Sequence, residues 1–158
     1  VPALIVDGAP ICESLAIVNY LGALKPELEM IPLASPLRRA FYDQWCVFAI
    51  SELEQPLWTI GKHKFALPQA QRCPEIFDSA QWEFQKALTH FSEGLGDRKY
   101  ILGESFSAAD IILGHTLFWG MAFKQPIEQD NLKAYLGRTG VRPALSAARA
   151  REQAAKSA

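Results

Sequence analysis

The stretch VPALIVDGAPICESLAIVNYLG, residues 1–22, decides the fold of this protein. Residues 3–6, ALIV, are typical of a buried strand, the dipeptide DG favours a tight hairpin turn, and residues 9–12, APIC, indicate a second short strand. Residues 13–22, ESLAIVNYLG, predict a helix that ends near Gly22, where a glycine C-terminal cap would fall. Two strands and one helix are too little to fold alone. We therefore expect another strand to pair with this sheet, although no later segment has the pattern of one.

Helical patterns fill the rest of the sequence after a linker. Residues 25–34 contain two prolines and no clear period, which is typical of a linker along a surface. Ser35 is placed as an N-cap, and Pro36 occupies the first helical position, where proline is preferred. The apolar residues that follow recur at helical spacing and are expected to face the core: Leu37, Phe41, Tyr42, Trp45, Cys46, Phe48, Ala49 and Leu53. Further helices are expected at about residues 74–95, from residue 107, at about 128–137 and at about 142–153.

The sharpest local motif is GESFSAADI, residues 103–111. Ser107 and Asp110 have the S-x-x-D spacing of a capping box, in which each side chain satisfies a backbone donor at the start of a helix. Phe106 and Ile111 have the spacing of the accompanying hydrophobic staple. The helix that follows is apolar almost all round, so we expect it to be the buried central helix of a bundle. This motif is interpreted as structural.

Composition and charge exclude several classes of function. Apolar residues make up 49% of the chain and charged residues 21%, the usual balance of a globular protein. The formal net charge is −1, and the basic residues are scattered, so neither nucleic acid nor an anionic membrane surface is expected as a partner. No stretch reaches the ~18 apolar residues of a membrane span, so no membrane insertion is expected.

The cysteines and histidines show no metal-ligand spacing. Cys12, Cys46 and Cys73 have no C-x-x-C arrangement, and their odd number fits reduced, mostly buried thiols in a cytoplasmic protein. His90 and His115 are interpreted as ordinary helix residues. No metal site is therefore expected.

A family resemblance rests on the motifs VPAL, ESLAIVNYL and YILGESFSAADI, in this order and separated by a proline-bearing linker. Together they resemble the cytosolic glutathione transferases of bacterial type, over Val1 to about Pro143. The resemblance implies a mainly α fold: the C-terminal part of a thioredoxin-like α/β domain (residues 1–24), a linker (25–34) and an all-helical C-terminal bundle (35–158). It also implies that the sequence begins at the third strand of the thioredoxin-like domain, without the strand–helix–strand unit before it.

The same resemblance assigns glutathione binding to Val1, Glu13 and Ser14. Val1 would exchange main-chain hydrogen bonds with the cysteinyl part of glutathione, next to a cis peptide at Pro2. Ser14, at a helix N-terminus, would bind the γ-glutamyl carboxylate, and Glu13 would bind the ammonium group of the same moiety. The residues alone leave an alternative, in which Ser14 is only an N-cap and Glu13 a solvated acid in the first turn.

The function that the resemblance implies is that of a detoxifying enzyme, a cytoplasmic homodimer. Its glutathione thiolate would attack, or reduce, a small hydrophobic electrophile. The family's catalytic Tyr, Ser or Cys lies near the end of the first strand, upstream of Val1, so no residue of this sequence takes that role. Cys12 is expected to be a packing residue instead. The alternative function is a non-catalytic binding or scaffold module that kept the fold of the family.

The electrophile is expected near the end of the first long helix, where Trp58, His63 and Phe65 lie. Aromatic residues at this spacing are more often core residues than substrate contacts. Some bacterial members of the family carry a His-Lys pair after an EL dipeptide on this helix. This chain has Glu54 and Gln55 there, so the contacts of that subclass do not transfer.

Overall fold

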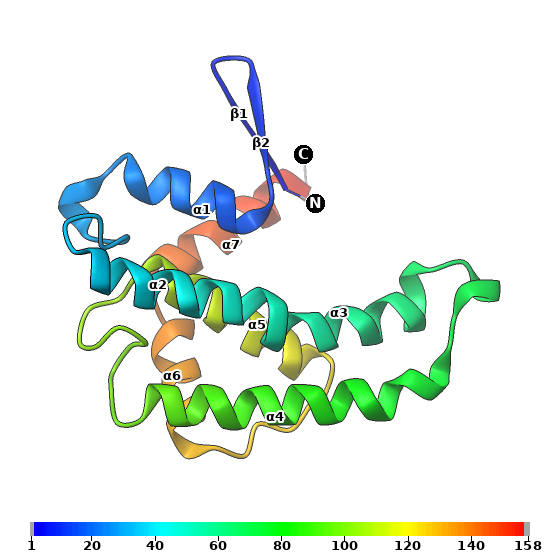
Figure 1. The fold of residues 1–158 in the computed structure, drawn as a ribbon. Helices are drawn as coiled ribbons and strands as arrows, with labels where there is room; N and C mark the ends of the chain where they lie inside the picture. The colour runs from blue at the N-terminus through cyan, green and yellow to red at the C-terminus, as the bar shows by residue number, and fades with distance from the viewer. Residues whose placement is uncertain (1, 157–158) are drawn as a thin grey trace.

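The computed structural model describes residues 2–156, and it places a β-hairpin and one helix on top of a bundle of helices (Figure 1). Strands β1 (Ala3–Val6) and β2 (Ala9–Cys12) pair antiparallel. The two turn residues, Asp7 and Gly8, both have positive φ angles, 49° and 82°. A two-residue hairpin turn of type I′ requires positive φ at both of its central residues. Helix α1 (Ser14–Ala23) follows. The predicted order of strand, turn, strand and helix is therefore confirmed.

The remaining elements are helical, as predicted. A long helical run consists of α2 (Pro36–Phe48), the π-helical segment η2 (Ala49–Glu54), α3 (Gln55–Gly61) and the π-helical segment η3 (Lys62–Ala66). Short 3-10 turns are η1 (Pro26–Leu28), η4 (Gln69–Gln71) and η5 (Pro74–Ile76). Helices α4 (Phe77–Leu95), α5 (Ala108–Ala122), α6 (Asp130–Gly140) and α7 (Pro143–Lys156) complete the chain. Figure 1 shows α4 running back alongside the long helical run.

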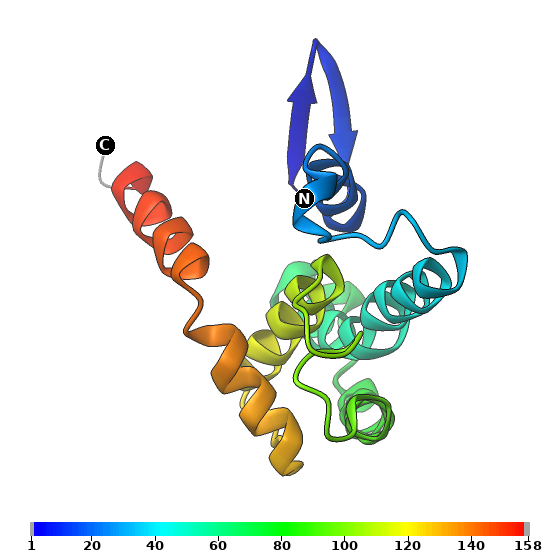
Figure 2. The same cartoon turned by 90° about the vertical axis from the view of Figure 1, so that its left-hand side faces the viewer.

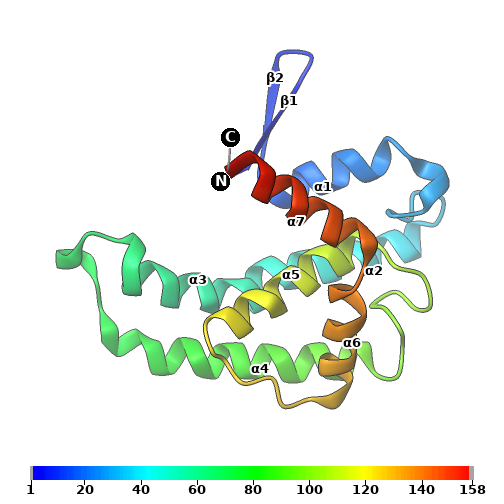
Figure 3. The same cartoon turned by 180° about the vertical axis from the view of Figure 1, so that it is seen from behind.

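Helix α5 is the central helix of the bundle, as its sequence predicts. It packs against α1, α2, η2 and α6, and Leu113 and Leu117 on it are completely buried. Ser107 and Asp110 form the predicted capping box at its start. Because α5 contacts both α1 and the other helices of the bundle, it sets the position of β1, β2 and α1, the hairpin unit, relative to the bundle (Figure 3).

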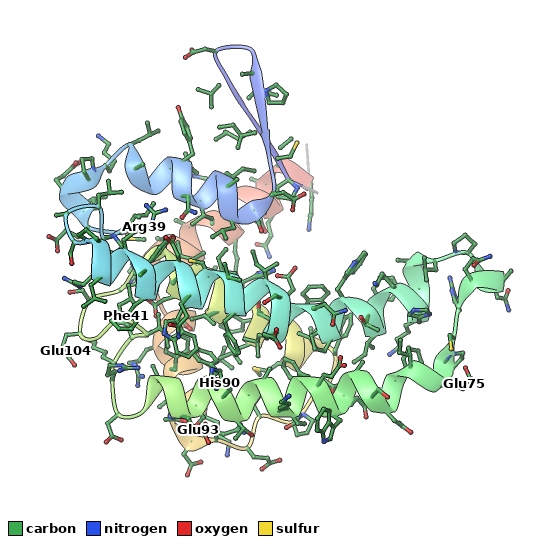
Figure 4. All side chains as sticks on the ribbon, in the orientation of Figure 1. Arg39, Phe41, Glu75, His90, Glu93 and Glu104 are labelled. Carbon is green, nitrogen blue, oxygen red and sulfur yellow. The ribbon has the colours of Figure 1, made fainter. Side chains whose placement is uncertain are left out.

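The buried face of α2 differs from the predicted one. Leu37 and Phe41 were expected in the core, but 67% and 48% of their surface is exposed. The buried residues of α2 are Tyr42, Trp45 and Cys46. The ring of Trp45 lies among Phe48, His90 and Phe91, with centroid distances of 5.2, 6.0 and 6.0 Å, and His90 is on the side of α4 that faces α2 (Figure 4). The stripe that α4 and α5 can cover is therefore the one that is buried.

The linker is anchored in the core rather than lying only on a surface. Ile31 is 4% exposed, and the backbone N–H of Ala108 donates a 2.8 Å hydrogen bond to the carbonyl of Met30. Gly22 lies inside α1, not at its C-cap, which is Leu24. A Cβ at Gly22 would come within 2.8 Å of the Ile31 Cδ1, so the glycine there allows the linker to pack closely against α1.

Helix α7 stands apart from the bundle. Figure 2 shows it separated from the hairpin and α1, and none of its described residues is buried. It begins after a short break behind α6, whose Tyr135 and Leu132 are in the core. Among residues 2–156, no helix combines the length and the apolar character needed to cross a membrane.

Candidate functional site

A cavity of about 1260 Å³ lies between the hairpin unit and the helices α5 to α7. Pro2 and the start of α1 form one side, and the first half of α7 forms another. Its apolar lining includes Ile111, Ile112, Phe118, Trp119 and Leu145. An open cavity of this size with a largely apolar lining can hold a small organic molecule.

Ser14 opens onto this cavity. It is the first residue of α1, and its side chain is exposed. The first α1 backbone hydrogen bond is donated by Ile17 to the carbonyl of Glu13, at 3.0 Å. The amides of Ser14 and the next two residues therefore have no partner within the helix, and such a terminus favours an anion.

Glu13, not Ser14, occupies the N-cap of α1. Its φ is 70° and ψ is 123°, a conformation that costs a non-glycine residue about 1–3 kcal/mol. Its side chain makes no capping hydrogen bond and is exposed. Ser14 is therefore not the N-cap, whereas Glu13 is exposed, as that alternative also expects. Both side chains remain available for a ligand.

The remaining predicted glutathione contact cannot be placed. Val1 lies outside the described residues, and so does the peptide bond that joins it to Pro2. Pro2 itself lines the cavity, together with Ser14. The structure thus brings the residue before β1 and the start of α1 to the same cavity.

Glu54 and His115 give the cavity an ionisable wall. Glu54 ends the π-helical segment η2, and π-helical turns are frequent at functional sites. Burial raises the pKa of its carboxyl above the ordinary value, and the charge of Glu13 raises it further, whereas His115 opposes the shift. Sequence reasoning treated His115 as an ordinary helix residue, and its spacing carried no other signal.

Trp58, His63 and Phe65, near which the sequence places the electrophile, do not line this cavity, and the expected core position is wrong for Trp58 and Phe65. Trp58 and Phe65 are 44% and 57% exposed, and Phe65 packs edge-on against Phe123. Nδ1 of His63 accepts a 3.0 Å hydrogen bond from the amide of Cys73. The long helical run carries these residues beyond the hairpin unit.

The thiols also differ from expectation. Cys46 is buried, but Cys12 and Cys73 are exposed, so most of the thiols are not buried and Cys12 is not a packing residue in the described structure. Burial raises the pKa of Cys46 to about 11, so its thiol stays protonated and inert at neutral pH. Within residues 2–156, no cluster of three or more His, Cys, Asp or Glu side chains could hold a metal ion.

Two cavity residues escaped sequence reasoning altogether. Arg142, just before α7, and Arg149, on α7, line the cavity, and their guanidinium groups lie 3.5 Å and 5.5 Å from the ring centroids of Phe106 and Phe118. Their spacing of seven residues would put them on one face of a continuous helix, and this was the only signal available. The two rings come from the segment just before α5 and from α5 itself, which the spacing of the arginines does not reveal.

Comparison with known families gives two matches. A model described as "Glutathione S-transferase, N-terminal domain" matches residues 1–23, and one described as "Glutathione S-transferase, C-terminal domain" matches residues 74–138. The second match includes the capping box and all of α4 and α5.

Among curated proteins, the chain is 27% identical over 147 residues to glutathione S-transferase GstA of Escherichia coli O157:H7, covering 90% of this chain and 69% of that protein. It is 29% identical over 119 residues to glutathione S-transferase U22 of Arabidopsis thaliana, covering 75% of this chain and 50% of that protein. The chain thus spans about half the length of the plant relatives it matches.

Solved structures show the same fold. "Ternary complex of BphK, a bacterial GST" superposes with a TM-score of 0.86 at 27% identity, covering 97% of this chain and 74% of that chain. A sphingomonad glutathione S-transferase complexed with glutathione superposes with a TM-score of 0.83 at 28% identity, with 97% and 74% coverage. The hairpin and α1 thus correspond to part of a thioredoxin-like domain, and the helices to a transferase C-terminal domain. This chain belongs to the glutathione transferase family.

Proposed function

We propose that this protein is a glutathione transferase that binds glutathione through Val1, Glu13 and Ser14 and uses its thiolate to attack, or to reduce, a small apolar electrophile. The observation that carries the proposal is the position of Ser14. Its hydroxyl and the free amides of α1 open onto a cavity of about 1260 Å³ with a largely apolar lining. Membership of the glutathione transferase family supports the same function.

The binding chemistry suits the two charged groups of a γ-glutamyl moiety. The α1 N-terminus presents unpaired amides and a hydroxyl, which together favour a carboxylate. The carboxylate of Glu13 is adjacent and makes no capping bond, so it can accept the ammonium group. Val1 would pair its main chain with the cysteinyl part, as one strand pairs with another.

The proposed reaction depends on lowering the pKa of the glutathione thiol. A thiol of pKa near 8.5 is mostly protonated at neutral pH, so an environment that favours the thiolate raises the concentration of nucleophile. We place the group that stabilises the thiolate outside this sequence, as the resemblance implies. Glutathione would thus be a substrate, and no metal would take part.

We also propose a homodimer that acts in cytoplasmic detoxification. Leu37 and Phe41 expose apolar side chains on the outer face of α2, which is the kind of surface that a second subunit covers. All three cysteines are free, which is usual in a reducing compartment. Light scattering of the purified protein would show whether a dimer forms.

The domain division is a proposal of the same kind. We assign residues 1–24 to the C-terminal portion of the thioredoxin-like domain, residues 25–34 to a linker and residues 35–158 to the helical domain. The matches at 1–23 and 74–138 support this division. The burial of Ile31 implies that the two parts unfold together, since the linker is part of the shared core.

The test is retention on immobilised glutathione combined with turnover of an activated chloronitrobenzene. We expect Ser14→Ala and Glu13→Gln each to weaken glutathione binding about tenfold, because each removes one charge-assisted hydrogen bond. Ser79→Ala is the matched control, because Ser79 is exposed on α4 and does not line the cavity. Retention without turnover would support the non-catalytic module instead, and wild-type protein that fails to bind the resin would overturn the proposal.

A further inference from the structure

We infer that the electrophile bound by this protein carries an anionic group, such as a carboxylate, which Arg142 and Arg149 hold at the α7 wall of the cavity. This inference rests on the proposed function, since it specifies the second substrate of the same site. It is carried by the arrangement of the two arginines and by what surrounds them.

Both guanidinium groups lie over aromatic rings. The Arg142 guanidinium carbon lies 3.5 Å from the centre of the Phe106 ring, and that of Arg149 lies 5.5 Å from the Phe118 ring. All four residues line the cavity. Stacking on a ring leaves the edge of a guanidinium free, and this edge carries the N–H groups that match a carboxylate.

Neither arginine is neutralised by a carboxylate. The ion pairs of residues 2–156 are Arg39–Asp43 and Lys133–Asp130, so no described carboxylate lies within 4.0 Å of either guanidinium. Glu152 is three residues beyond Arg149 on α7 and also lines the cavity, but it does not pair with it at that distance. Two unpaired positive charges therefore face an apolar space.

The acidic residues on the other walls do not compensate these charges. Asp110 lines the cavity, but its oxygens accept hydrogen bonds from Ile101, Ser107 and Tyr135. Glu54 has His115 and Glu13 as its electrostatic neighbours, and neither arginine is among them. The two arginines thus line the cavity without a carboxylate partner, although Glu152 lies on the same wall, and they favour a ligand whose anionic group lies next to them.

Apolar residues line the cavity beside the arginines. Ile111, Phe118 and Leu145 line the cavity on α5 and α7. A ligand with an aromatic body and one carboxylate would place the body on these residues and the carboxylate on the arginines. Its reacting carbon would then point towards the α1 end, where the proposed function places glutathione.

The experiment uses two matched electrophiles, 4-chloro-3-nitrobenzoate and 4-chloro-3-nitrobenzamide. In each, the glutathione sulfur forms a bond to the ring carbon, chloride leaves with the bonding electron pair, and the thiol proton passes to solvent. We expect Arg142→Gln and Arg149→Gln each to lower kcat/KM for the benzoate at least tenfold relative to the benzamide. The KM for glutathione should stay unchanged.

Arg151→Gln is the matched control, because Arg151 is on the same helix, is exposed and does not line the cavity. If it changes the benzoate preference as much as the two cavity variants do, the inference is wrong, because general surface charge would explain the effect. An unchanged preference in Arg142→Gln and Arg149→Gln also overturns it. A raised KM for glutathione in these variants overturns it as well, since the arginines would then bind glutathione itself.

A second readout separates this inference from the proposed function. Binding of 8-anilinonaphthalene-1-sulfonate, which has an aromatic body and one anionic group, needs neither glutathione nor turnover. We expect its Kd to rise at least fivefold in Arg142→Gln and Arg149→Gln and to stay the same in Arg151→Gln. A protein that shows this pattern without transferase activity would refute the proposed function but keep the proposed site for an anionic apolar ligand. Equal binding by all three variants would refute that site.

Discussion

The phenol of Tyr135, on α6, donates a 2.8 Å hydrogen bond to Oδ1 of Asp110, in the first turn of α5. Asp110 is 1% exposed, and it also accepts hydrogen bonds from the amide of Ile101 at 2.9 Å and from the amide and hydroxyl of Ser107, both at 2.8 Å. Burial raises the pKa of Tyr135 well above its ordinary value, so the phenol keeps its proton. One carboxylate thus joins the start of α5 to α6 and to the segment before α5, at Ile101.

We expect Asp110→Ala to lower the free energy of unfolding by about 3–5 kcal/mol, because it leaves several buried donors without an acceptor. Tyr135→Phe should cost only about 1–1.5 kcal/mol, because it removes one of the donors and leaves the others paired with Asp110. Urea unfolding followed by circular dichroism measures both. Equal costs for the two variants would show that Asp110 does not stabilise the helix start through its other bonds.

Two glycines should respond to alanine in opposite directions. A Cβ at Gly94 would overlap the indole of Trp45, which is wedged between rings and cannot move away easily. We expect Gly94→Ala to destabilise the protein by about 1–3 kcal/mol, the usual cost of overpacking. Nothing lies within 4 Å of a Cβ at Gly137, so Gly137→Ala should stabilise α6 by about 0.5–1 kcal/mol. Thermal unfolding of both variants tests the pair, and destabilisation by Gly137→Ala would contradict the packing.

Thiol reactivity should separate the three cysteines. Cys12 and Cys73 are exposed, so both should react with an aromatic disulfide reagent in the folded protein, whereas Cys46 should react only after unfolding. The thiol of Cys73 donates a 3.2 Å hydrogen bond to Glu75, which raises its pKa, so Glu75→Gln should speed its reaction. Cys12→Ser and Cys73→Ser assign the two phases. A thiol that still reacts quickly in the folded double variant would contradict the burial of Cys46.

Stability should depend on pH through Glu54. Because burial raises the pKa of Glu54, the folded state binds its proton more tightly than the unfolded state does, so this contribution to stability is lost as pH rises above about 4.5. We expect Glu54→Gln to be more stable than wild type at pH 7 and equal to it near pH 3.5. Urea unfolding across this range is the measurement, with Glu52→Gln, an exposed neighbour, as the control for loss of charge. A stability advantage of Glu54→Gln confined to low pH would reverse the assigned sign.

The features that the sequence by itself determined are those that depend on contacts within one or two turns. The DG hairpin, the N-cap at Ser35 and the capping box of Ser107 and Asp110 each join residues two to four positions apart, so their geometry follows from local residue types. The family motifs belong to the same short segments. The site residues Glu13 and Ser14 were predicted from them, and their contacts with glutathione remain a prediction.

Tertiary structure alone decided which surfaces meet. Helix α2 carries two apolar stripes, and the packing of α4 and α5 buries the one with Tyr42 and exposes Leu37 and Phe41. Arg142 reaches Phe106 across 36 positions of sequence, and Glu54 meets His115 across a cavity. Such pairs depend on the path of the whole chain, because burial and charge act through space, and no local pattern encodes the distance between segments that far apart.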